Sequence, residues 1–220
     1  MRIKNSLWVL VLLISMGLTS LSFAQAPAVQ ERVAAIKQAF QQSQQKLRTF
    51  EWIETITVSM KGEVKSQKQN RCYYGMDGVL QKVPVSGAPQ EKKNEKLTDY
   101  MEQVVGLVKL YVPPIAEEIQ KSVSSGNVSV QILEPGRRVD VQFGNYAQAG
   151  DSLTVGFDLT SNRILDAKVA TYLGTPKDPV NLDVQFGVLN DGTIYTTDVT
   201  LDAPAKKIQV AVKNTGYRPV

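Results

Sequence analysis

The sequence predicts an α+β protein in which an antiparallel sheet, apolar on one side, is covered by helices. Apolar and polar residues alternate along short segments between Val128 and Asn214, and this period of two places the apolar side chains on one face. Turn residues separate the segments regularly, as in a meander, and no helical period follows residue 127. The alternating sets are Val128-Val130-Ile132, Val139-Val141-Phe143, Leu153-Val155-Phe157-Leu159, Leu165-Ala167-Val169, Leu182-Val184-Phe186-Val188 and Ile208-Val210-Val212.

Residues 1–24 predict a secretory signal peptide that is cleaved from the mature protein. A charged start with Arg2 and Lys4 precedes an apolar run, and small residues lead to a cut after Ala24. A membrane anchor is less favoured, because the run is shorter than the roughly 20 apolar residues of a spanning helix. We therefore expect a periplasmic or secreted protein, without a stable transmembrane anchor after cleavage.

The mature chain, residues 25–220, is long enough for a single domain with a substantial core. The formal net charge of +4 falls to +2 when the two basic residues of the signal leave, since no acidic residue leaves with them. The remaining basic residues are scattered along the chain, so nucleic acid is not an expected partner.

The first part of the mature chain predicts one helix and three strands. Residues 28–48 repeat apolar residues at helical spacing and form a narrow amphipathic stripe. Strands are expected over residues 50–85, where the period changes to two. One face of the first strand carries Trp52, Ile56, Val58 and Met60, with Glu54 as the exception.

The middle of the chain predicts two helices, over 97–111 and 115–124, within a segment 97–124. The first is apolar over more than half of its circumference, and Pro113-Pro114 ends it, because proline cannot donate the helical hydrogen bond. Strands are expected again over 128–214. Asp191-Gly192 indicates a tight hairpin turn between two of them.

The residue inventory disfavours catalysis and metal binding. The chain has no histidine, so the commonest general base and metal ligand is missing, and we expect a protein without enzymatic activity, cofactor or metal. Acidic pairs such as Glu117-Glu118 are more typical of solvent-exposed faces than of hydrolytic pairs. Cys72 is the single cysteine, which favours a buried apolar role. An intermolecular bridge or a reactive thiol remains an alternative.

The order of elements resembles the LolA/LolB superfamily of periplasmic lipoprotein-localisation factors. The local likeness lies in Ser152–Leu165, where Asp158 precedes a turn and a new strand begins, as in the family's strand-turn-strand. The resemblance covers most of the mature chain as architecture, and it implies a curved, open antiparallel half-barrel whose apolar concave face is covered by helices. No position matches the family's lid-locking arginine, so the resemblance extends to the fold and not to individual residues.

A half-barrel covered by helices implies an apolar cavity in which the helices of 97–124 act as a lid. We expect such a cavity to bind a lipid or an acylated lipoprotein, in the manner of a carrier or chaperone. The alternative is a protein-interaction or sensor domain of the cell envelope with a filled core. Candidate lining residues, each of which could equally belong to a filled core, are Trp52, Ile56, Val58, Met60, Met101, Val105, Val108, Phe157 and Phe186.

Overall fold

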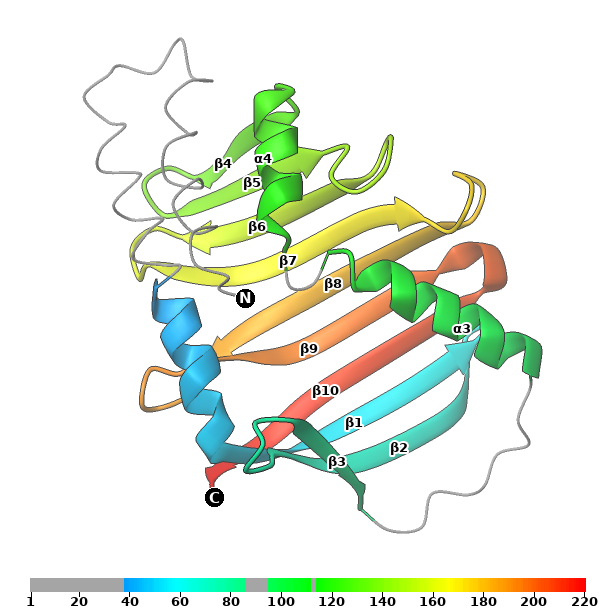
Figure 1. The fold of residues 1–220 in the computed structure, drawn as a ribbon, viewed down its shortest axis with the longest axis vertical. Helices are drawn as coiled ribbons and strands as arrows, with labels where there is room; N and C mark the ends of the chain where they lie inside the picture. The colour runs from blue at the N-terminus through cyan, green and yellow to red at the C-terminus, as the bar shows by residue number, and fades with distance from the viewer. Residues whose placement is uncertain (1–37, 86–94, 112–113) are drawn as a thin grey trace.

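The computed structural model describes residues 38–85, 95–111 and 114–220 (Figure 1). The predicted signal peptide, 1–24, and the first part of the predicted helix, 28–37, lie outside the described residues. The strands are β1 (Phe50–Met60), β2 (Glu63–Tyr74), β3 (Leu80–Pro84), β4 (Val128–Glu134), β5 (Arg138–Gly144), β6 (Ser152–Asp158), β7 (Arg163–Tyr172), β8 (Pro179–Val188), β9 (Ile194–Ala203) and β10 (Ile208–Pro219).

Over these residues the ten strands form one antiparallel sheet in the order β3-β2-β1-β10-β9-β8-β7-β6-β5-β4. The edge strands β3 and β4 do not pair with each other, so the sheet is open, as the family resemblance implies. This arrangement is compatible with a half-barrel. Strands β4 to β10 form the predicted meander, and β1 joins it by pairing with β10.

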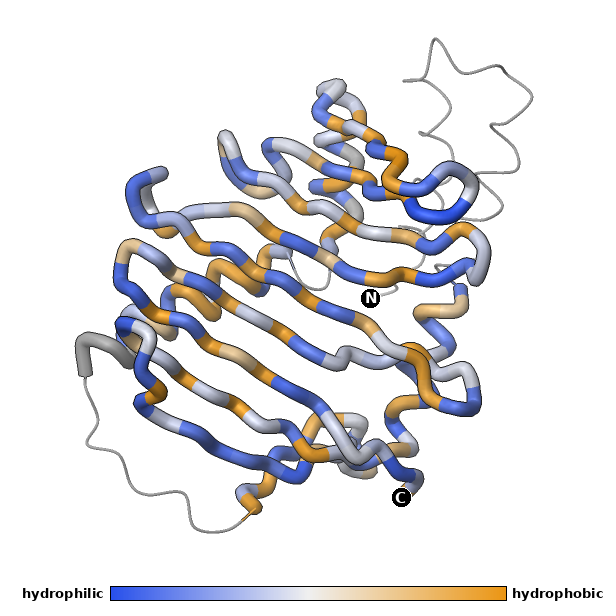
Figure 2. Tube along the Cα trace, turned by 180° about the vertical axis from the view of Figure 1, so that it is seen from behind, coloured by the Kyte–Doolittle hydropathy of each residue, from blue (hydrophilic) through white to orange (hydrophobic). Residues whose placement is uncertain are grey.

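The topology places the helices on one face of the sheet. Since β3 and β4 lie at opposite edges, the chain between them must cross the sheet from one edge to the other. That connection contains α3 (Glu95–Val108) and α4 (Ala116–Ser124), and Figure 1 shows both on the same face. We call this the inner face; Figure 2 shows the molecule from the other side, the outer face.

The inner face is apolar because aligned residues of successive strands repeat the same pattern. In two rows, each crossing eight strands from β4 to β1, every position is apolar. The first row is Val128, Phe143, Leu153, Val169, Leu182, Leu201, Val210 and Val58. The second row is Val130, Val141, Val155, Ala167, Val184, Val199, Val212 and Ile56.

The outer face is polar for the same reason, since the intervening residues point away from the helices. A row from β5 to β2 contains only one apolar residue, Ala211. Its members are Gln142, Thr154, Lys168, Asp183, Thr200, Ala211, Thr57 and Gln67. A shallow depression of about 380 Å³, lined mostly by polar residues, lies across β5 to β9 on this face.

A helix over residues 38–46 precedes β1 and contacts the hairpin between β8 and β9. The ring of Phe40 meets Phe186 edge-on at 5.6 Å between centroids. The buried Ser43 hydroxyl accepts a hydrogen bond from the Ile194 amide at 3.0 Å, and Lys46 pairs with Asp191 at 2.8 Å. The segment ends in the 3₁₀ turn η1 (Leu47–Thr49).

Two boundaries differ from the predicted ones by more than two residues. Helix α3 ends at Val108 instead of 111, because the amides of Leu110 and Tyr111 bond the carbonyls three residues back, which tightens the chain into turns. Strand β10 runs to Pro219 instead of 214. Gly216, at a φ of 66°, forms a bulge there and interrupts the alternation that marks a strand.

The hairpin between β8 and β9 forms where Asp191-Gly192 predicts it, but not with a two-residue turn. Only Gly192 has a positive φ, and its amide bonds the carbonyl of Leu189 at 2.9 Å in a five-residue loop. The two-residue geometry occurs instead between β1 and β2. Lys61 and Gly62 both have positive φ there, at 54° and 82°.

Candidate functional site

Helix α3 lies on the inner face across one end of β8, β9 and β10 (Figure 1). Val104 is fully buried, and Met101, Leu107 and Val108 pack against the same cluster of sheet residues. In this cluster, the middle of the first apolar row is closed to solvent. The exposed fractions of Leu153, Val169, Leu182 and Leu201 are 0%, 3%, 5% and 7%.

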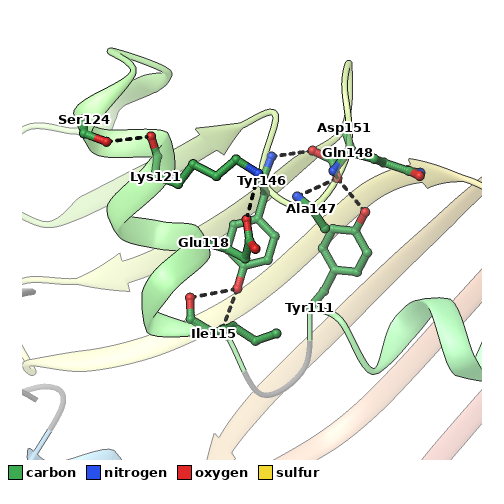
Figure 3. A network of polar contacts seen from close by, with 9 residues as sticks. All are labelled: Tyr111, Ile115, Glu118, Lys121, Ser124, Tyr146, Ala147, Gln148 and Asp151. Carbon is green, nitrogen blue, oxygen red and sulfur yellow. Dashed lines mark hydrogen bonds and ion pairs between the residues drawn. The ribbon is translucent and has the colours of Figure 1, made fainter. Parts of the chain in front are cut away.

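The C-terminal end of α3 is anchored by Tyr111 (Figure 3). This side chain is fully buried, and its hydroxyl lies 2.6 Å from Asp151 Oδ2 and 2.6 Å from the Thr171 hydroxyl. Burial, together with the hydrogen bond to Asp151, raises the pKa of Tyr111 far above its usual value. The hydroxyl therefore remains protonated and donates to the carboxylate.

Asp151 sits in the loop between β5 and β6, where the backbone surrounds its carboxylate. The amide of Tyr146 donates to it at 2.5 Å, that of Ala147 at 3.0 Å and that of Gln148 at 2.8 Å. Together with the Tyr111 hydroxyl, four donors converge on a side chain that is only 3% exposed. Hydrogen bonds to a buried charge are strong, so this is a rigid attachment point.

The same loop holds the start of α4. The hydroxyl of Tyr146 accepts a hydrogen bond from the Ile115 amide at 2.5 Å and also lies 3.3 Å from the Ile115 carbonyl. The ring of Tyr146 stacks on that of Tyr111, with centroids 5.5 Å apart. The residues on either side of the α3–α4 link are therefore both fastened to the β5–β6 loop (Figure 3).

The N-terminal half of α3 is attached more lightly. The Tyr100 hydroxyl donates to Asp178 in the β7–β8 loop at 3.0 Å, and the Lys206 ammonium lies 5.6 Å from the Tyr100 ring centroid. Partial burial, followed by the hydrogen bond to Asp178, raises the pKa of Tyr100 to about 12. Unlike Tyr111, Tyr100 is only half-buried.

Three of the predicted lining residues pack against the apolar core cluster of the inner face. Met101 and Val108 reach it from the helix, and Phe186 reaches it from β8. Phe186 also contacts the 38–46 helix through Phe40.

The predicted lining residues on β1 lie to one side of this core. Ile56 and Val58 end the two apolar rows, and Met60 pairs with Ile208. All three are half-buried. Trp52 belongs to a separate aromatic group, in which its ring stacks on Tyr217 at 5.2 Å.

The last two predicted lining residues occupy different positions. Phe157 is half-buried on the inner face of β6, opposite Val139. Val105 is 48% exposed on the side of α3 that faces away from the core.

Two further residues that stand out in the sequence are Glu54, the exception on the apolar face of β1, and the single cysteine, Cys72. Glu54 pairs with Lys82 at 2.6 Å and accepts a hydrogen bond from Asn70 at 3.2 Å, so its charge is compensated across β1, β2 and β3. Cys72 is a free, fully buried thiol, and burial raises its pKa to about 11. A thiol in this state is a poor nucleophile.

The anchoring residues Tyr100, Tyr111, Tyr146 and Asp151 were not among the predicted site residues. The sequence carries a weak signal for one of them, because Asp151 follows Gly150 in a turn, where aspartate often accepts backbone hydrogen bonds. The contacts themselves join residues 40 and 78 positions apart, which no local period can reveal.

Within the described parts of the chain, no three histidine, cysteine, aspartate or glutamate residues lie close enough to hold a metal ion. No helix among the same residues has the length and hydropathy needed to cross a membrane.

Neither a family model nor a curated protein sequence matches the chain. Among solved structures, a LolA superfamily protein from Nitrosomonas europaea aligns with 8% identity and a TM-score of 0.39, over 84% of this chain and 93% of that one. A DUF1329 family protein from Desulfovibrio piger aligns with 9% identity and a TM-score of 0.34, over 84% and 92%. A chain of the Pseudomonas aeruginosa MucA/MucB complex aligns with 8% identity and a TM-score of 0.23, over 85% and 98%. The predicted resemblance to the LolA superfamily is one of fold, and a member of that superfamily is among these neighbours.

Proposed function

We propose that this protein is an exported, non-enzymatic carrier that binds the acyl chain of a lipid or lipoprotein between α3 and the inner face. The observation that carries the proposal is the extent of the apolar rows. Each crosses eight strands, and the closed centre beneath α3 is flanked by half-buried or exposed apolar residues. One flank lies on β1, where Val58 is half-buried, and the other lies on β4, where Val130 is exposed.

An acyl chain enters this site by taking the place of α3 side chains. Because Val104 is fully buried, α3 must move away from the sheet before a chain can lie along the rows. Burying about a dozen methylenes contributes roughly 10 kcal/mol, which is enough to compete with the packing of one helix face. The light attachment at Tyr100 and the firm one at Tyr111 favour a movement that opens at the N-terminal half of α3.

The test is titration of the mature chain with a fluorescent fatty-acid probe. We expect saturable binding at one site, lost in Val58→Asp, which puts a charge on the inner face. Thr57→Asp is the matched control. Thr57 is the neighbour of Val58 on the same strand, but its side chain points to the outer face, so this variant should bind the probe normally. Circular dichroism melts confirm that both variants fold. Absence of saturable binding, or equal binding by the two variants, would contradict the proposal.

One observation favours a second candidate, an interaction domain of the cell envelope with a permanently filled core. The cluster under α3 is closed, with Val104 and Leu153 at 0% exposure. If α3 does not move, the acyl probe finds no site, and the amides beneath α3 show the same hydrogen-exchange protection with and without lipid. The titration therefore separates the two candidates.

A further inference from the structure

The two edges of the sheet differ in how they are protected from pairing with another strand. Edge strand β3 has five residues and carries Lys82 and Pro84, both of which discourage strand addition. Edge strand β4 has seven residues, VSVQILE, with no charge or proline before Glu134, and its pairing with β5 is regular from Val128 to Ile132, before a bulge between Ile132 and Glu134. Over Val128 to Ile132, β4 therefore lacks the features that discourage strand addition.

The edge of β4 is also open to solvent. Every residue from Ser129 to Glu134 is exposed, and on the inner face Val130 is 48% and Ile132 60% exposed. The side chains of Val130 and Ile132 extend the apolar surface formed by Val141 and Val139, their partners on β5. A solvated edge with alternate apolar residues is a template for an added strand that repeats the same alternation.

The sequence of β4 supplies that alternation when it is paired antiparallel with itself. With Gln131, the central residue of the strand, on a twofold axis, Val130 of one copy lies opposite Ile132 of the other on the inner face. The outer pairs of this register, Ser129 with Leu133 and Val128 with Glu134, reach the bulge that follows Ile132, and neither brings like charges together. A twofold contact needs a self-complementary surface of this kind.

We propose that β4 pairs antiparallel with β4 of a second copy of this chain, so that the two sheets form one continuous sheet in a twofold dimer. The axis is perpendicular to the sheet, because opposed residues of antiparallel strands share a face. The inner faces of the two copies therefore lie on the same side, and their apolar rows join at Val130 and Ile132. The dimer does not depend on lipid binding.

The first experiment measures mass by sedimentation velocity over a range of concentrations. We expect a dimer for the mature chain and at least a tenfold weaker dimer for Ile132→Lys, which places a charge on the joined inner face. Val83→Lys makes the same kind of change on the β3 edge, where the side chain is 41% exposed, and should leave the dimer unchanged. A monomer at all concentrations, or a dimer that Ile132→Lys does not weaken, would overturn the proposal.

The second experiment tests the register. In a Cys72→Ser background, Gln131→Cys places two thiols opposite each other at the axis, and mild oxidation should yield a covalent dimer. Val83→Cys, exposed on the other edge, should form no covalent dimer under the same conditions. A covalent dimer with Val83→Cys but not with Gln131→Cys would show that the copies meet through another surface.

Discussion

The two ends of α3 are both fastened by a tyrosine hydroxyl to an aspartate, yet they differ in burial. At the C-terminal end, Tyr111 is fully buried, and Asp151 accepts three further hydrogen bonds from the backbone. At the other end, Tyr100 is half-buried and meets Asp178 in a surface loop. The same chemical pair can thus serve as a fixed attachment or as a releasable one, depending on access to water.

The difference follows from the cost of leaving polar groups unpaired. If the buried pair separates, no water replaces the lost partner, and each stranded group costs about 1–3 kcal/mol. If the half-buried pair separates, water can reach both groups, and the net cost is below about 1 kcal/mol. For this reason, we expect α3 to pivot about Tyr111 when it opens.

The largest effect is expected for Asp151→Ala. This substitution strands the amides of Tyr146, Ala147 and Gln148 along with the Tyr111 hydroxyl, and should lower the free energy of unfolding by about 3 kcal/mol or more. Urea denaturation measures the loss, with Asp178→Ala as the control at the half-buried end. Equal losses for the two variants would remove the distinction between the ends.

Tyr111→Phe should have the next largest effect, a loss of about 1–2 kcal/mol. It keeps the stack on Tyr146 but leaves Asp151 and Thr171 without the hydroxyl. Thermal unfolding gives the magnitude, and hydrogen exchange shows whether the amides of α3 lose protection together. A change of less than about 0.3 kcal/mol would mean that Asp151 is satisfied without Tyr111.

Tyr100→Phe should change the global stability by less than about 1 kcal/mol, because its hydrogen bond is accessible to water. If α3 opens at this end, the same substitution should speed the association of the acyl probe, measured by stopped-flow fluorescence. Tyr172→Phe, which removes a hydroxyl bonded to Ala149 in an exposed contact outside α3, is the control. If the association rate is unchanged in Tyr100→Phe, α3 does not open at its N-terminal half.

The smallest effect is expected from pH. The folded-state pKa of Tyr100, about 12, lies above the usual value of about 10 for tyrosine. Its contribution is therefore fully present below pH 10 and is lost as the pH rises through about 12. The stability difference between the native chain and Tyr100→Phe should be constant from neutral pH to about 10 and then decline. A difference that already changes near neutral pH would assign the contact to another titrating group.

The sequence indicates the faces of this fold because side-chain direction along a strand is local. The alternation of Val58 with Thr57, or of Leu182 with Asp183, is visible from neighbouring residues alone and agrees with the inner and outer rows of the structure. Where a local irregularity intervened, the pattern failed. Gly216 interrupts the alternation, so the pattern predicts too early an end for β10. Tyr111 continues the helical spacing of apolar residues, but it lies beyond the end of α3, and its hydroxyl bonds to Asp151.

Other features of the site are set by contacts between distant residues. Glu54 looked like an exception on an apolar face until β3 brought Lys82 within 2.6 Å. Trp52, expected beside the lid, instead stacks on Tyr217, a residue beyond the predicted end of the last strand. No local pattern contains these pairings.

By itself, the sequence determined which residues are apolar on each strand, where the helices interrupt the strands and that histidine chemistry is absent. The tertiary structure decided the order of the strands. That order determines which strands are edges and which face the connecting helices cross. Because β1 pairs with β10, the two ends of the described chain close on each other, and β3 and β4 become opposite edges. The connection between them must then cross one face as α3 and α4. Strand order is a choice among pairings of similar local energy, and it is settled only when the whole apolar face is buried at once.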